Sequence, residues 1–322
     1  MNAALLATQL IALMGPVPGP DGTAVKMDAG QTATLARQLE YMESRVFTTK
    51  YPALKARSFI PVDTGIPAGA ETITYRVWDG YAMAKVVANY ADDIEMVDVT
   101  AKEITSRIKS VASGYTFSVQ DLRAIAMSGQ PIDTMRAAMA RRAIEAGLDE
   151  VAAFGIPEAG MPGFVNHPNV PLVSPITGTW SGATDAQIMA DFGKLVKSIV
   201  IATKGIHTPD TVIFDTDTFE LLANKVVGQN LDRTLLDVLL KNSPHIRNID
   251  FWPKLATANA AGTGPRIVCY ARDSEVLELK IAQEFEQFPP QPVNLAFKVP
   301  CHARIGGTVI RYPLAVAYMD GC

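Results

Sequence analysis

The sequence predicts an α+β protein in which one long helix precedes a strand-rich C-terminal region. Residues 132–154 are rich in Ala, Met, Arg and Glu, which favour helix, and they would form a rod of roughly 35 Å. Apolar and polar side chains alternate over residues 72–77 and again between 277 and 301, which is the period of a strand. Between these regions, residues 185–240 combine helical stretches with a buried strand, as in a small α/β unit.

The composition is that of a folded protein without a nucleic-acid-binding face. The chain has 322 residues, of which 48% are hydrophobic and 19% charged, enough for one large domain or two ordinary ones. The formal net charge is −4, and no stretch carries the clustered Lys and Arg that tight DNA binding requires. The three cysteines form no CxxC pair, so we expect a reducing compartment and neither a disulfide framework nor a zinc site.

Residues 1–57 are expected to form an arm. No basic residue precedes the apolar run at residues 1–14, and the run is too short to span a membrane, so it predicts a short amphipathic helix and no signal peptide. Gly15 and Pro16 end this helix, and a polar helix capped by Asp28 is predicted over residues 31–48. Little in this segment could form a core alone.

Residues 58–99 are expected to form a long hairpin. Ile73, Tyr75 and Val77 alternate with polar residues in the first strand. The Asp79-Gly80 dipeptide is typical of a hairpin turn, so residues 81–90 are predicted to return along this strand. An isolated two-stranded hairpin is marginally stable in water.

Residues 100–158 are predicted to hold a strand and two helices. Ile104, Ser106 and Ile108 lie on one face of the strand, and Ser118 and Asp121 are candidate caps for the first helix. The Gly129-Gln130-Pro131 sequence interrupts the helical pattern before the long helix at 132–154.

The rest of the chain is expected to divide into an α/β unit, residues 159–265, and returning strands, residues 266–322. The first part should contain a helix over 185–203, a buried strand at 211–214, a helix capped by Asp217 and ending at Lys225, and a helix over 231–240. In the second part, Gly306-Gly307 is predicted to be a turn between strands that cover 277–281, 293–301, 308–312 and 314–318.

Asp215 and Asp217 come closest to a catalytic motif. They follow a predicted strand, as do the nucleophile and the acid/base of haloacid-dehalogenase-type phosphatases. Phe219 stands where that motif requires Thr or Val, so we favour Asp215 in a turn and Asp217 as a helix cap. The four histidines are far apart, and the sequence has no phosphate-binding loop or nucleophile elbow. No catalytic, cofactor-binding or metal site is expected.

Aromatic residues and Arg gather in the first 81 residues, where too little chain is nearby to form a core. Both residue types are enriched at protein interfaces. Ordering the arm and the hairpin costs about 1–2 kcal/mol per residue of backbone entropy, which contacts with a neighbouring subunit would offset. The predicted inter-subunit contacts are Tyr41, Tyr51, Arg57, Tyr75, Arg76, Trp78 and Tyr81.

Six short residue patterns stand out from about residue 30 onwards: Gln38–Tyr41, Tyr51–Arg57, Gly69–Arg76, Gly129–Asp133, Arg304–Gly307 and Tyr312–Val316. Together they resemble the patterns of one group of tailed-bacteriophage major capsid proteins, which have the Hong Kong 97-type fold. The resemblance implies an N-terminal arm (1–57), an extended loop (58–99), a peripheral domain with a spine helix (100–158), an axial domain (159–265) and strands that return to the peripheral domain (266–322).

The resemblance also implies a structural subunit that is not an enzyme and needs no cofactor. Its partners would be copies of itself, in pentamers and hexamers of an icosahedral virion capsid, and packaged double-stranded DNA that it does not bind tightly. We expect assembly in the host bacterial cytoplasm without a membrane, with a separate scaffolding protein, a portal and, in some virions, a decoration protein.

Two other functions stay open at this point. One is the shell of an encapsulin-like nanocompartment, and the other is an α/β phosphatase or hydrolase that uses Asp215. The best-known relative crosslinks a Lys of its extended loop to an Asn of a neighbour, and Lys85 and Asn294 are residues of these types here. Nothing in the sequence indicates the desolvated amine and nearby carboxylate that this reaction needs, so a non-covalent shell is expected.

Overall fold

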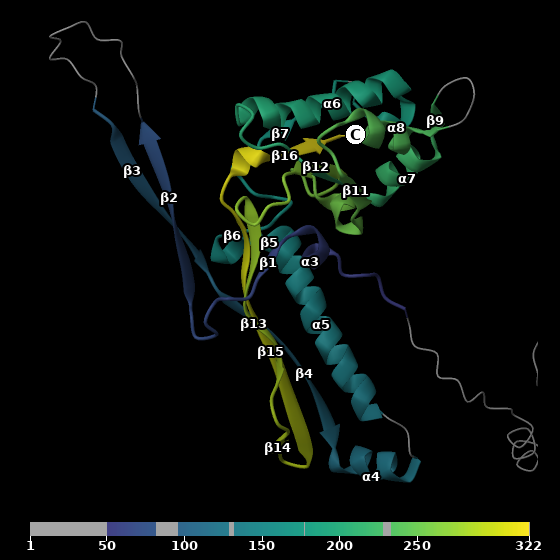
Figure 1. Ribbon diagram of the computed structural model, residues 1–322. Coiled ribbons are helices and arrows are strands. Elements are labelled where there is room, and N and C mark those ends of the chain that lie inside the picture. Colours follow the sequence, from purple (N-terminus) through teal and green to yellow (C-terminus); the bar gives the residue numbers. More distant parts are fainter. Residues whose placement is uncertain (1–49, 82–95, 129–131, 177, 228–232, 322) are drawn as a thin grey trace, which may run out of the picture. The chain divides into compact units, whose positions relative to one another are not determined.

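The computed structural model describes residues 50–81, 96–128, 132–176, 178–227 and 233–321 (Figure 1). The helices predicted within residues 1–48 and the break at 129–131 lie outside these ranges. The chain divides into Met1–Pro52 and Ala53–Cys322, and every element described below belongs to the second unit.

The first of two five-stranded sheets in the described residues carries the long helix. Its order is β1-β13-β15-β14, and β4 also pairs with β15. Helix α5 (Ile132–Phe154) packs on this sheet and confirms the helix predicted at these residues (Figure 1). Ala140, Ile144, Leu148 and Ala152 are buried because a four-residue spacing places them on one side of the helix. The strands are β1 (Val62–Asp63), β4 (Lys109–Ser118), β13 (Leu277–Gln287), β14 (Gln291–Val293) and β15 (Ala296–Ile310).

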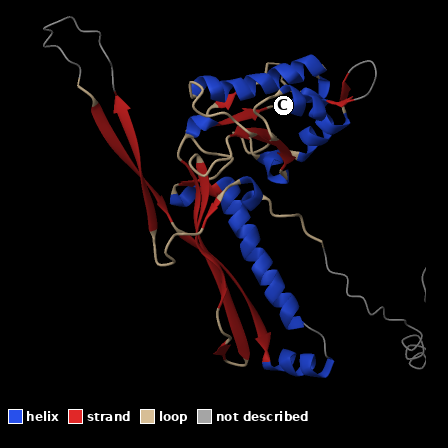
Figure 2. Ribbon diagram, in the orientation of Figure 1, coloured by secondary structure: helices blue, strands red, loops and turns tan. Residues whose placement is uncertain are grey.

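The second sheet has the order β11-β8-β12-β16-β7, and helices pack against it (Figure 2). All four residues of β8 are buried, which confirms the strand predicted at 211–214. The helix predicted over 185–203 is confirmed within one residue. The strands are β7 (Leu172–Val173), β8 (Thr211–Phe214), β11 (Asn248–Phe251), β12 (Arg266–Tyr270) and β16 (Val316–Asp320), and the helices are α6 (Asp185–Ala202), α7 (Thr216–Asn224) and α8 (Leu235–Asn242).

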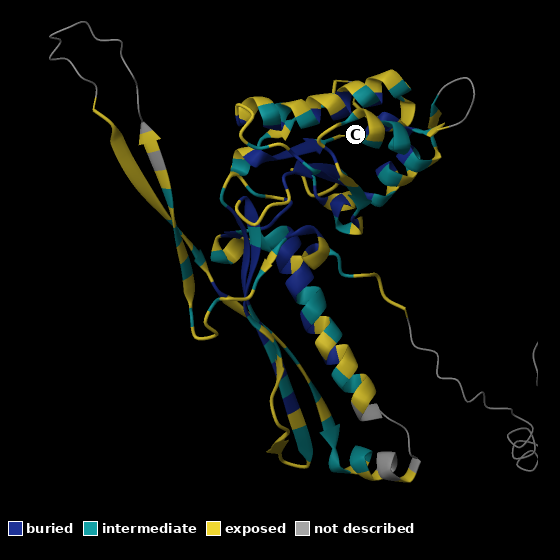
Figure 3. Cartoon of the chain, viewed as in Figure 1, coloured by how far each residue is buried: buried dark blue, intermediate teal, exposed yellow. Residues whose placement is uncertain are grey.

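Residues 266–322 supply strands to both sheets, and not to the first alone. Strands β13 and β15 belong to the first sheet, whereas β12 and β16 pair with each other in the second. The buried residues form two hydrophobic clusters: one combines the first sheet with one face of the second sheet, and the other lies on the opposite face of the second sheet (Figure 3).

The start of α7 differs from its prediction. Asp215, and not Asp217, is the N-cap, and its carboxylate accepts a hydrogen bond from the Thr218 N–H at 3.2 Å. A capping residue has extended backbone just before the first helical turn, and Asp217 already lies inside that turn.

The start of α8 also differs, because the helix predicted from residue 231 begins at Leu235. Thr234 caps it with its side-chain oxygen, and residues 233–234 pair with residues 226–227 as strands.

Strands β2 (Thr72–Tyr81) and β3 (Asp98–Arg107) form an antiparallel hairpin. The turn predicted at Asp79-Gly80 is wrong, because both residues continue β2 and lie opposite Thr100 and Val99. The strand that pairs with β2 is β3, and the return predicted at residues 81–90 lies, apart from Tyr81, outside the described residues. A dipeptide signal is local, whereas the pairing of β2 depends on a strand further along the chain.

The turn predicted at Gly306-Gly307 is also wrong, because β15 runs through both residues to Ile310. Ile305 lies opposite Ile281 and Gly307 opposite Lys280, so Gly306 is the extra residue of a bulge. Gly307 has a φ of 76°, which favours glycine. The two glycines therefore bend one long strand instead of ending it.

Helix α4 (Val119–Ser128) starts as predicted. The Asp121 N–H donates to Ser118 Oγ at 3.0 Å, and the Ser118 N–H donates to Asp121 Oδ2 at 3.3 Å. Ser118 is thus the cap and Asp121 its reciprocal partner in the first turn. The short elements are α3 (Ala56–Phe59), β5 (Gly155–Ile156), β6 (Met161–Pro162), β9 (Val226–Val227) and β10 (Arg233–Thr234).

Candidate inter-subunit surface

The hairpin of β2 and β3 has two different faces. Residues directly opposite each other share a face, so Tyr75 and Ile104 lie on one face, and Trp78 and Ala101 on the other. The first face is half-buried and the second is exposed (Figure 3). We call the exposed one the outer hairpin face, which consists of Thr74, Arg76, Trp78, Val99, Ala101, Glu103 and Thr105.

The outer hairpin face combines an apolar end with polar pairs. Trp78 is 66% exposed and Val99 is 54% exposed. Arg76 Nε donates to Glu103 Oε1 at 2.7 Å, and both side chains are largely exposed, so the pair contributes little to folding. Interfaces between proteins are typically rich in Trp and Arg at their centre and have a polar rim. The exposed Trp78 beside the Arg76–Glu103 ion pair fits this composition.

The inner face of the hairpin lies against the body of the protein. A cavity of about 400 Å³ separates the two, and Tyr75, Val77, Ile104, His167 and Arg311 contribute to its lining. Burial raises the pKa of Tyr75 and lowers that of His167, because both lose contact with water. The predicted contact Tyr75 therefore faces the same subunit.

One hydrogen bond joins the root of the hairpin to the first sheet, and another closes the root itself. Ser106 Oγ donates to the Gly306 carbonyl of β15 at 3.1 Å, and the Ile108 N–H, just after β3, donates to the Glu71 carbonyl, just before β2, at 2.8 Å. A Cβ atom at Gly306 would lie 2.5 Å from Cδ1 of Ile73. Glycine at this bulge therefore lets the hairpin root approach β15 closely.

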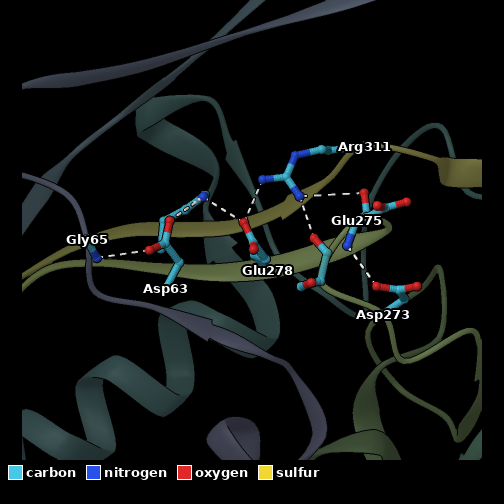
Figure 4. Close-up of polar contacts among 8 residues, drawn as sticks. Asp63, Gly65, Asp273, Glu275, Glu278 and Arg311 are labelled. Carbon is cyan, nitrogen blue, oxygen red and sulfur yellow. Dashed lines mark hydrogen bonds and ion pairs between the residues drawn. The ribbon is translucent and has the colours of Figure 1, made fainter.

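A network of ion pairs lies beside this root (Figure 4). Lys280 Nζ is 2.5 Å from Asp63 Oδ2 and 2.7 Å from Glu278 Oε2, and Arg311 binds Glu278 at 2.5 Å. The Lys280 side chain is only 10% exposed. Its hydrogen bond, together with one from the Gly65 N–H, holds the pKa of Asp63 below its ordinary value. The network fixes β1, and with it the chain entering the hairpin, to β13.

Of the other four predicted contact residues, Arg57 lies away from the outer hairpin face. Arg57 lies on α3 and forms a two-point ion pair with Glu284, at 3.0 and 2.8 Å. Tyr51 is 47% exposed in the N-terminal unit. Tyr81 ends β2, where its side chain lies outside the description, and Tyr41 lies wholly outside it.

Sequence reasoning missed exposed apolar residues in two places. Val99 belongs to the outer hairpin face, and the alternation of Val97, Val99 and Ala101 with polar residues could have predicted it. Val293 ends β14 and is 42% exposed, and Leu295 lies in the turn that follows and is 79% exposed. No sequence signal separated these two from core residues of the same type.

The described residues offer little for catalysis. Asp215 is 2% exposed and caps α7, so a structural role, although as the cap and not in the predicted turn, explains its position better than that of a nucleophile. No group of three His, Cys, Asp or Glu side chains suited to a metal occurs in the described part of the chain. None of the helices described is long and apolar enough to cross a membrane.

A sequence-family model described as major capsid protein matches residues 82–322. No curated protein sequence matches the chain. Among solved structures, the capsid of the Myoviridae phage XM1 has a TM-score of 0.79 at 14% identity, covering 89% of this chain and 98% of that one. A chain from Mycobacterium phage Adephagia has a TM-score of 0.61 at 16% identity, covering 89% and 92%. A virus-like particle from Pyrococcus furiosus has a TM-score of 0.53 at 14% identity, covering 81% and 90%.

Proposed function

The chain belongs to the major capsid protein family, and from that membership we propose that it builds the icosahedral head of a tailed bacteriophage around double-stranded DNA. Members of this family are structural subunits of multimeric virion shells, so the chain is a structural protein and not an enzyme. The phosphatase alternative at Asp215 is therefore set aside.

The outer hairpin face is the observation that supports this proposal most. A two-stranded hairpin is marginally stable by itself, yet this one exposes Trp78 and Val99 along ten-residue strands. Closed symmetry gives every copy of such a surface a partner. Contact between the outer hairpin face and a neighbouring subunit would remove the apolar side chains from water, with Arg76 and Glu103 at the rim.

The proposed assembly consists of pentamers and hexamers of this chain. A separate scaffolding protein, a portal and, in some virions, a decoration protein would be its other partners, and assembly would take place in the host bacterial cytoplasm. The boundaries proposed for the subunit are an arm at 1–57, an extended loop at 58–99, a peripheral domain at 100–158, an axial domain at 159–265 and strands that return to the peripheral domain at 266–322. The net charge of −4 is consistent with a shell that does not bind its DNA tightly.

A hairpin truncation tests the role of the outer hairpin face. Thr74 and Thr105 lie opposite each other, and their hydroxyl groups are 3.0 Å apart, so an Asn-Gly turn can replace residues 75–104 while the root stays intact. The truncated chain is expected to remain folded by circular dichroism but to form no shells in negative-stain electron microscopy. Shells like those of the full chain would contradict the proposal.

The contents of the particles distinguish a phage head from an encapsulin-like compartment. The likeness to a virus-like particle at 14% identity concerns the fold alone and does not separate the two. Particles from infected cells are expected to contain nuclease-protected double-stranded DNA. A co-purifying enzyme in place of DNA would favour the compartment.

A further inference from the structure

The cavity between the hairpin and the body has a histidine in its body wall. Its volume is about 400 Å³, and the inner face of the hairpin forms one wall with Tyr75 and Lys102. The opposite wall contains His167 and Asn169, from the chain before β7, together with the end of β15 and the residues just after it. We call this space the His167 cavity.

The His167 ring is held in a way that suits its neutral form. Its Nδ1 accepts a hydrogen bond from the Asn169 N–H at 3.3 Å, so this nitrogen carries no proton. The His167 N–H donates to the Tyr318 hydroxyl at 3.2 Å, which ties the same residue to β16. A proton added to the neutral ring would have to bind Nδ1, and it would therefore break the hydrogen bond from Asn169.

The lining of the cavity does not compensate a positive charge on this ring. Among the described side chains, the charged groups of the lining are Lys102, on β3, and Arg311, after β15, and both are cations. Glu278 binds Arg311 but is not part of the described lining. Burial lowers the pKa of His167 and raises that of Tyr75, because water is limited on both walls while the hairpin lies against the body.

We propose that His167 is a proton-sensitive switch for the hairpin: its neutral ring lets the hairpin lie against the body, and protonation of the ring releases it. The protonated ring is a charge without a counter-charge in a cavity that it shares with Lys102. Movement of the hairpin away from the body admits water and removes this cost. The root stays in place, because Asp63 keeps its charge at the pH where histidine titrates.

The hairpin should be closed against the body at neutral pH and open more often in acid. Burial lowers the pKa of His167 in the closed state, whereas water would return this pKa toward its ordinary value in the open state. The closed state therefore binds fewer protons, and its advantage decreases as the pH falls below about 6.5. The switch acts within one subunit, so its failure would not affect the proposed assembly.

Amide hydrogen exchange of the full-length, unassembled chain at about pH 7.5 and about pH 5.5 tests the proposal. After correction for the intrinsic effect of pH, amides of β2 and β3 should exchange at least about twofold faster in acid, while those of β13 and β15 should not change. His167→Gln keeps an acceptor for the Asn169 N–H but does not titrate, so its hairpin should not respond to pH. His245→Gln is the matched control, because His245 is exposed and not part of the described lining, and it should behave as the wild type does.

The pKa of His167 gives an independent check that decides the matter even if His167→Gln fails to fold. Slow hydrogen exchange at the imidazole carbon, followed by mass spectrometry, measures the pKa of each histidine. Replacing residues 75–104 by Asn-Gly should raise the pKa of His167 and leave that of His245 unchanged. A wild-type hairpin whose exchange does not respond to pH, a response that persists in His167→Gln, or a pKa of His167 that is the same with and without the hairpin would each overturn the proposal.

Discussion

Lys280 lies at the centre of the ion-pair network beside the hairpin root. Its ammonium group is almost buried between two carboxylates, those of Asp63 and Glu278. Removing one partner from a buried ionic cluster leaves uncompensated charge, which costs far more than losing a surface pair. The network was not predictable from the sequence, because residues 63 and 280 meet only through the parallel pairing of β1 with β13.

Lys280→Met should therefore destabilise the unassembled subunit by about 2–4 kcal/mol. The substitution keeps the apolar stem of the side chain and removes its charge. Lys241→Met is the control, because Lys241 pairs with the partly exposed Asp237 one helical turn away and should change the unfolding free energy by no more than about 0.5 kcal/mol. Denaturant unfolding measures both. Equal effects of the two substitutions would show that the network does not hold the root.

Asp63 gives the same network a dependence on pH. Its pKa is lowered in the folded protein, so its contribution to stability is fully present above the pKa of the unfolded chain and is lost as the pH falls through the folded value. The free energy of unfolding should therefore decrease below about pH 4, and Asp63→Asn should show a shallower decrease. Denaturant unfolding at several pH values checks this, and identical slopes for the two proteins would contradict it.

At the scale of elements, Gly306 connects the hairpin to the first sheet. A side chain here would meet Ile73 of β2 and, at 3.2 Å, Cβ of Lys280 on β13. Gly306→Val should cost about 1–3 kcal/mol by overpacking, and should speed amide exchange in β2 and β3. Gly182→Ala is the control, because a Cβ atom there meets nothing within 4 Å. Hydrogen-exchange mass spectrometry compares the two variants. Unchanged protection of the hairpin in Gly306→Val would show that Gly306 does not connect the hairpin to the first sheet.

The elements differ in how far their sequence predicted them. Helix α5 and strand β8 were predictable because their signals, helix-forming composition and a short apolar run, lie within the element itself. The hairpin was predicted correctly, but its turn was predicted at the wrong place. The Asp79-Gly80 dipeptide is typical of a turn, yet here it lies inside a longer strand. Gly306-Gly307 was likewise predicted to be a turn, because glycine is common in turns. Glycine is also common in β-bulges, and these two residues form one. The outer hairpin face was predicted only in part, because Arg76 and Trp78 lie on it while Tyr75 faces inward.

The assembled protein is expected to form a shell without covalent links between its subunits. Asn294 lies in the turn between β14 and β15 with a φ of 55°, and Lys85 lies outside the described residues. Particles boiled in detergent under reducing conditions should release a single band near 34.6 kDa. A ladder of heavier bands that Lys85→Arg abolishes would show that the subunits are crosslinked.

Self-assembly into shells can be tested by negative-stain electron microscopy of the purified protein. The family, the fold and the exposed outer hairpin face all predict closed, uniform shells in which each hairpin contacts a neighbouring subunit. Image averages should show icosahedral symmetry. A protein that stays monomeric at high concentration, with its scaffolding partner present, would contradict the account.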